Sequence, residues 1–155
     1  MITNRIDYDN NIDSERMINP STEPYVYIDS NRRIIDANNQ LKQFVTVVGD
    51  INAETIYFAV DRYFDNVDLF EKQCMIKYRS KYGDVVSVEP SDYYVEKVGL
   101  TERIIFGWTL TDKITSIPRN VDFQIAFYSY KEDGYTFDYM LNTIPNVLTV
   151  KQGLV

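Results

Sequence analysis

The chain has 155 residues, of which 45% are apolar and 25% charged, a balance that is typical of a folded soluble domain. It contains no histidine and one cysteine, Cys74, which excludes Ser-His-Asp and Cys-His catalysis, histidine-bearing zinc sites and an intrachain disulfide. Sixteen basic and 23 acidic residues give a net charge of −7. An acidic surface repels phosphate backbones, so we expect no nucleic-acid partner.

The first 24 residues differ from the rest of the chain. They are rich in Asn, Asp and Ser and show no sustained strand or helix period. Two hypotheses fit them: a loose terminus, or an extended arm that orders on a partner through isolated apolar residues such as Ile2, Ile6 and Tyr8. They contain no signal-peptide pattern, and no window of the chain approaches the ~18 apolar residues of a membrane span. We therefore expect synthesis in a reducing cytoplasm and no membrane partner.

From Tyr25 onward, apolar residues recur with period two, which predicts strands separated by turns. The sequence also favours short helical turns near 68–72 and 112–116 and a last strand within 146–155. The other predicted elements, in chain order, are a strand at 25–28, a turn at 29–31, strands at 32–36, 54–64 and 73–79, a turn at 82–84, strands at 85–90, 103–111 and 121–130, a turn at 132–134 and a strand at 135–139.

This spacing predicts an all-β fold for residues 25–155, an antiparallel β-sandwich of about 8–9 short strands with residues 1–24 as an N-terminal arm. Cys74 lies in an alternating strand, where we expect it to be a small buried apolar residue. Gly107 lies inside a strand pattern, which indicates a bulge or a close approach of another chain segment.

Carboxylates are the only acid–base groups that the sequence offers in a cluster. Asp61, Asp65 and Asp68 are oxygen donors of the kind that calcium prefers, but the glycine and final glutamate of an EF-hand are absent, so we interpret them as a solvated loop. No carboxylate pair is marked out for glycoside hydrolysis, and no glycine-rich phosphate loop occurs. We predict a protein that is not an enzyme, with no catalytic residue, no metal and no cofactor.

Aromatic residues are numerous, with 13 Tyr and 8 Phe. Many belong to strands and are explained by core packing. Four of them, Tyr128, Tyr130, Tyr135 and Tyr139, flank one predicted hairpin, and with Ile2, Ile6 and Tyr8 they form a candidate partner interface. Exposed rings also stack on sugars, so a carbohydrate-binding module that recognises a host surface is the alternative hypothesis.

The order of several segments resembles the N-terminal β-sandwich domain of phage upper-baseplate and related tail-associated structural proteins, from viruses of Gram-positive bacteria. Leu141 stands where that family usually has Trp, and the chain ends at Val155, where many members continue into a stalk or fibre. The segments are YVYIDSNRRIID (25–36), GDINAETIYFAVDRYFDNVDL (49–69), IKYRSKYGDVVSVEP (76–90), IIFGWTLTDKIT (104–115), VDFQIAFYSY (121–130) and LNTIPNVLTVKQGL (141–154).

The resemblance implies a structural protein of a bacteriophage virion. Such a module docks to other virion proteins in the tail baseplate, neck, collar or fibre attachment, and it takes part in a symmetric homo-oligomeric assembly built in the bacterial cytoplasm. A small β module of this kind needs strand edges, aromatic surface and a terminal arm rather than catalytic groups. Because the stalk is absent from the resembling region, host recognition is not part of this expectation.

Overall fold

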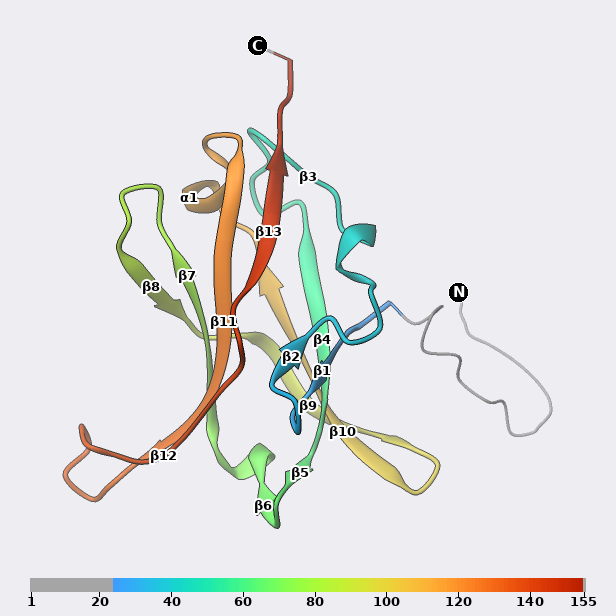
Figure 1. Ribbon diagram of the computed structural model, residues 1–155, viewed down its shortest axis with the longest axis vertical. Coiled ribbons are helices and arrows are strands. Elements are labelled where there is room, and N and C mark those ends of the chain that lie inside the picture. Colours follow the sequence, from blue (N-terminus) through green and yellow to red (C-terminus); the bar gives the residue numbers. More distant parts are fainter. Residues whose placement is uncertain (1–23, 155) are drawn as a thin grey trace.

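The computed structural model describes residues 24–154, and it confirms the all-β sandwich (Figure 1). These residues form 13 strands, nine of which are longer than two residues. Helical structure is confined to α1 (Asp112–Thr115) and to single 3₁₀ turns at Leu41–Gln43 and Leu69–Glu71 within the described part. The predicted arm and its residues Ile2, Ile6 and Tyr8 lie outside the described residues.

Two sheets make up the sandwich, and a short hairpin stands at one end of it. In the first sheet the strand order is β2 (Ile34–Ile35), β1 (Val26–Asp29), β4 (Thr55–Asp61), β10 (Thr101–Thr109) and β9 (Ser91–Val98). In the second it is β3 (Thr46–Val47), β13 (Asn146–Lys151), β11 (Arg119–Tyr130), β7 (Gln73–Arg79) and β8 (Val85–Val88), with β12 (Phe137–Asn142) also paired to β11. The hairpin joins β5 (Tyr63–Phe64) and β6 (Val67–Asp68).

Eight of the ten strand pairings in the described residues are antiparallel, and two are parallel: β1 with β4, and β13 with β3. Between β1 and β4 the chain leaves the first sheet, adds β3 to the second, and returns in its original direction. Alternation along a single strand carries no information about such a crossover, so the sequence predicted only antiparallel pairs.

The strand prediction missed β9 and divided some elements differently. Residues 54–64 break at Arg62, where β4 ends and β5 begins, and the predicted strand at 135–139 lies at Phe137–Asn142. The turn between β5 and β6 places Asp65 and Asn66 at φ 52° and 68°, the left-handed conformation that a two-residue hairpin turn requires. Asp61 therefore ends β4, and Asp65 and Asp68 belong to the hairpin rather than to an open loop.

Aromatic rings from both sheets meet in the core. Phe58 on β4 and Trp108 on β10 face Phe123 on β11, at ring-centroid distances of 6.2 and 5.0 Å. Phe106 on β10 meets Phe127 on β11 edge-on at 6.1 Å. All five rings are at most 2% exposed, so the contact between the sheets is dry. The thiol of Cys74 is buried in the same core, as predicted, and burial raises its pKa.

Gly107 confirms the expected bulge and close approach. The pairing of β10 with β9 shifts between Ile105 and Gly107. A Cβ atom at this glycine would lie 2.8 Å from Ser91 Oγ and 3.0 Å from Tyr57 Cε1. The bare backbone thus leaves room for the Tyr57 ring on the outer face of the first sheet.

Replacing Gly107 by alanine should lower the free energy of unfolding by about 1–3 kcal/mol, because the new methyl group overpacks this contact. Urea denaturation monitored by circular dichroism measures the change. Ser87→Ala, an exposed position in β8, is the control and should change stability by less than about 0.5 kcal/mol. A Gly107→Ala protein as stable as the parent would contradict this reading of the contact.

Candidate functional site

Tyrosines and one arginine occupy the outer face of the first sheet. Val26 and Ile28 of β1 point into the core, so Tyr25 and Tyr27 point outward. By the same alternation, β10 presents Arg103 outward. Ala59 of β4 lies beneath these longer side chains and is only 2% exposed. Because the alanine side chain is short, the surface is recessed at Ala59 between the larger side chains of Tyr27 and Arg103.

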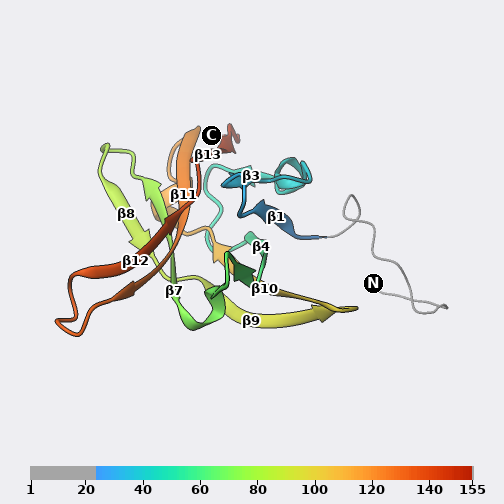
Figure 2. The same ribbon diagram turned by 60° about the horizontal axis from the view of Figure 1, so that its bottom comes forward.

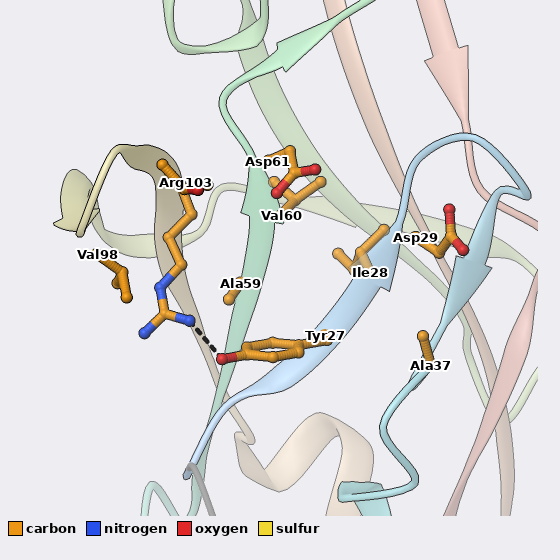
Figure 3. A pocket seen from close by; sticks show the side chains of 10 residues that line it. Tyr27, Ile28, Asp29, Ala37, Ala59, Val60, Asp61, Val98 and Arg103 are labelled. Atoms are coloured by element: carbon orange, nitrogen blue, oxygen red, sulfur yellow. Dashed lines mark hydrogen bonds between the residues drawn. The ribbon is translucent and has the colours of Figure 1, made fainter. Parts of the chain in front are cut away.

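This recessed surface belongs to a groove of about 360 Å³ (Figure 3). Figure 3 shows the Tyr27 hydroxyl and the Arg103 guanidinium meeting beside Ala59, with Asp29 and Asp61 at the edge of the same hollow. The residues that line it come from β1, β4, the β9–β10 hairpin and the segment after β2: Tyr27, Ile28, Asp29, Ala37, Ala59, Val60, Asp61, Val98, Thr101 and Arg103.

Arg103 is held in one position by four neighbouring groups. Its Nε donates to Glu96 Oε1 at 2.7 Å, and its Nη1 donates to the Tyr27 hydroxyl oxygen. Its guanidinium also lies over the rings of Tyr25 and Tyr27, 5.2 and 5.4 Å from their centroids. The Arg103 side chain is only 11% exposed. These contacts fix the cation before any ligand arrives.

The pKa values of two side chains at the groove, Tyr25 and Asp29, are shifted. Burial, and then the nearby charge of Glu96, raises the pKa of Tyr25, so its hydroxyl stays protonated and donates to Glu96 Oε2. The hydrogen bond from the Arg32 side chain holds the pKa of Asp29 below its usual value, so this carboxylate stays ionised. The arrangement offers rings, fixed donors and a carboxylate edge, which suit binding.

A larger hollow of about 520 Å³ lies between the β7–β8 hairpin and α1. Its walls come largely from turn residues, and its most prominent ring, Tyr82, is 80% exposed. The groove around Arg103 is instead lined mostly by residues of paired strands.

Asp68, one of the three aspartates considered as calcium ligands, pairs instead with Arg62. The guanidinium donates to both Asp68 oxygens, at 2.9 and 2.8 Å, and to Glu102 Oε1 at 2.8 Å. In residues 24–154, no group of three or more Cys, Asp or Glu side chains is placed to hold a metal ion. The Arg62 cluster ties the β5–β6 hairpin to β10.

The Arg62–Asp68 pair makes the free energy of unfolding depend on pH. The Arg62 side chain holds the pKa of Asp68 below its usual value of 3.8, so the pair stabilises the fold fully above about pH 4 and less as the pH falls through the lowered pKa. Asp68→Asn should lower stability at pH 7 and flatten its decline on acidification. Urea unfolding between pH 7 and pH 2.5 measures this. Glu132→Gln, at an exposed turn position, should keep the parent's profile; a parent-like profile in Asp68→Asn would contradict the assignment.

The tyrosines predicted as an interface do not all lie on one surface. Tyr128 and Tyr130 share the outer face of the second sheet, and Tyr130 is 40% exposed. Tyr139 pairs with Ser129 on the opposite face, packs against the core and lies beneath Lys72. Tyr135 is exposed in the turn. Tyr139 therefore lies on the other face from Tyr128 and Tyr130, because a strand alternates its side chains between two faces.

The groove residues Tyr27 and Arg103, and their neighbours Tyr25 and Glu96, were not singled out from the sequence. The alternation of residues 25–28 did carry a usable signal, since two inward aliphatic residues imply two outward tyrosines. The missing information was the identity of the neighbouring strands.

No protein-family model, curated protein or solved structure matches this chain. None of the helices in residues 24–154 has the length and apolarity needed to cross a membrane. The fold places the chain among the all-β sandwiches.

Proposed function

We propose that this chain is a non-catalytic structural protein of a bacteriophage virion, which docks to other virion proteins through the groove on the outer face of its first sheet. The observation that carries the docking role is the fixed cluster of Tyr25, Tyr27 and Arg103 around that groove. The virion role is supported by the resemblance of the segments quoted above.

Tyrosine and arginine are enriched among the residues that contribute most to protein–protein binding. A tyrosine ring supplies apolar area together with one hydrogen-bonding group. In this groove the Arg103 guanidinium is already oriented by Glu96 and Tyr27. Binding of a partner therefore costs little side-chain entropy at Arg103. A partner that contributes apolar side chains and a few hydrogen-bond acceptors fits these walls.

In the virion, we also propose that copies of the chain assemble into a symmetric homo-oligomer. The N-terminal arm with Ile2, Ile6 and Tyr8 stays a prediction, because it lies outside the described residues.

The test is to express the tagged chain in a bacterial host during infection by the phage that encodes it, and to purify the particles through two density gradients. Quantitative mass spectrometry should then find the chain at a fixed number of copies per particle. A glycan array probed with the same protein tests the carbohydrate-binding alternative. Absence of the chain from the particles would overturn the virion role, and saturable glycan binding that is lost in Tyr27→Ala would overturn protein docking as the role of the groove.

A further inference from the structure

The β11–β12 hairpin carries a second surface, on the opposite sheet from the groove. Figures 1 and 2 show this hairpin extending away from the body of the sandwich. Its turn, at residues 131–136, is exposed throughout. This turn is thus free of the core packing that Phe127 and Tyr139 make nearer the body of the sandwich.

Three rings gather on its outer face. Tyr130 and Phe137 stack at a centroid distance of 4.8 Å with 18° between their planes. Tyr128 meets Tyr130 and Phe137 edge-on, at 5.5 and 5.6 Å. Tyr130 is 40% and Phe137 is 42% exposed, so two of the three rings present much of their surface to solvent. We call these three residues the hairpin aromatic cluster.

A β-bulge builds this cluster. Ser129 pairs with Tyr139, and regular pairing would place Asp138 opposite Tyr130. The register shifts by one residue, so Phe137 stands there instead. Bulges of this kind redirect a side chain. In this hairpin the bulge places the Phe137 ring, rather than the Asp138 carboxylate, beside Tyr130, so that the two rings stack.

Acidic residues outnumber basic ones in the hairpin that carries the cluster. Residues 128–140 contain three acids, Glu132, Asp133 and Asp138, and one base, Lys131, so their net charge is 1 − 3 = −2. Glu89 is close enough to Tyr128 for its charge to contribute, after burial and Tyr130, to the raised pKa of that hydroxyl. Negative charge beside the electron-rich faces of rings favours a cation.

Three rings elsewhere on the described surface already have such a cation from the chain itself. Arg62 lies over Tyr63, Lys72 over Tyr139 and Lys81 over Tyr82, at centroid distances of 4.9 to 5.3 Å. Among the described residues, no Lys or Arg lies over a ring of the hairpin aromatic cluster. A cation from outside the chain would complete the same contact there.

We propose that the hairpin aromatic cluster is a docking site for a basic segment of a protein partner, which places a Lys or Arg side chain over the Tyr130–Phe137 stack. This site is separate from the groove and holds whether or not the partner is a virion protein. The rings supply the cation–π contact, and the surrounding carboxylates supply charge complementarity.

The test uses a fluorescein-labelled twelve-residue peptide of alternating Gly and Arg as the probe, with a matched peptide of alternating Gly and Gln. Fluorescence anisotropy at 0.15 M salt should show saturable binding of the arginine peptide and at least about tenfold weaker binding of the glutamine peptide. Backbone amide NMR shifts should locate the peptide on residues 128–140. The absence of binding, or shifts confined to other regions, would overturn the proposal.

Two variants distinguish the contribution of the aromatic rings to peptide binding from that of the protein's negative charge. Tyr130→Leu combined with Phe137→Leu keeps apolar area but removes both π-faces, and it should weaken arginine-peptide binding by about tenfold. Tyr82→Ala removes a ring that is 80% exposed on another hairpin and should leave the affinity unchanged. Equal affinity of the double variant and the parent would mean that net charge alone attracts the peptide. Tighter binding to glycans than to the arginine peptide would assign the cluster to sugars instead. Because particle incorporation is measured separately, failure here leaves the virion role standing.

Discussion

Replacing Phe106 by alanine should lower the free energy of unfolding by about 3–5 kcal/mol, the largest loss that we expect from a single substitution. Phe106 is fully buried on β10. Its ring stacks on Phe58 at 5.3 Å, contacts Tyr93 at 6.1 Å and reaches Phe127 of the opposite sheet. Removing it loses the transfer free energy of the ring and leaves a cavity whose rigid aromatic walls collapse only in part.

Urea denaturation followed by circular dichroism at 25 °C measures this loss from the shift of the midpoint at constant slope. Tyr82→Ala, which removes an exposed ring, is the matched control and should change stability by less than about 0.5 kcal/mol. A loss below about 1 kcal/mol for Phe106→Ala would mean that the two sheets are not joined through this ring.

Replacing both Tyr25 and Tyr27 by alanine should remove the chain from purified particles. The two rings flank Arg103, and truncating residues of this kind at the centre of an interface costs about 2–4 kcal/mol of binding, a factor of roughly 30 to 1,000 in affinity. Both side chains lie on the outer face, so the core residues Val26 and Ile28 keep their packing. The measurement is the number of copies per particle by quantitative mass spectrometry.

Two further variants make this result interpretable. Tyr27→Phe keeps the ring and removes only the hydroxyl that accepts from Arg103, so it should be incorporated better than the double variant. Tyr82→Ala, on the β7–β8 hairpin, should be incorporated like the parent. A folded double variant that enters particles at the parent's level would show that the groove is not the docking surface.

Local sequence patterns predicted a large part of the fold. Period-two alternation located most of the longer strands, and it assigned Phe123, Ile125 and Phe127 to one face of β11, where all three are buried. The turns at 82–84 and 132–134 and the helical turns at Leu69–Glu71 and Asp112–Thr115 are also confirmed. These features depend on residues that are close together in the chain.

The candidate site depends on contacts between distant residues, which the sequence did not predict. Tyr27 and Arg103 are 76 residues apart, and they meet because β1 pairs in parallel with β4, which pairs with β10. The β9 strand was missed because none of its residues is fully buried, so an alternation of apolar core residues does not mark it. Phe137 was overlooked for a related reason: only the bulge brings it opposite Tyr130.

An electron-microscopy map of the intact particle, at a resolution that shows side chains, tests the docking role of this sandwich most directly. We expect polypeptide from a neighbouring chain to fill the groove against Tyr27 and Arg103 in every copy. A map in which the sandwich is present and this groove faces solvent in all copies would contradict the account.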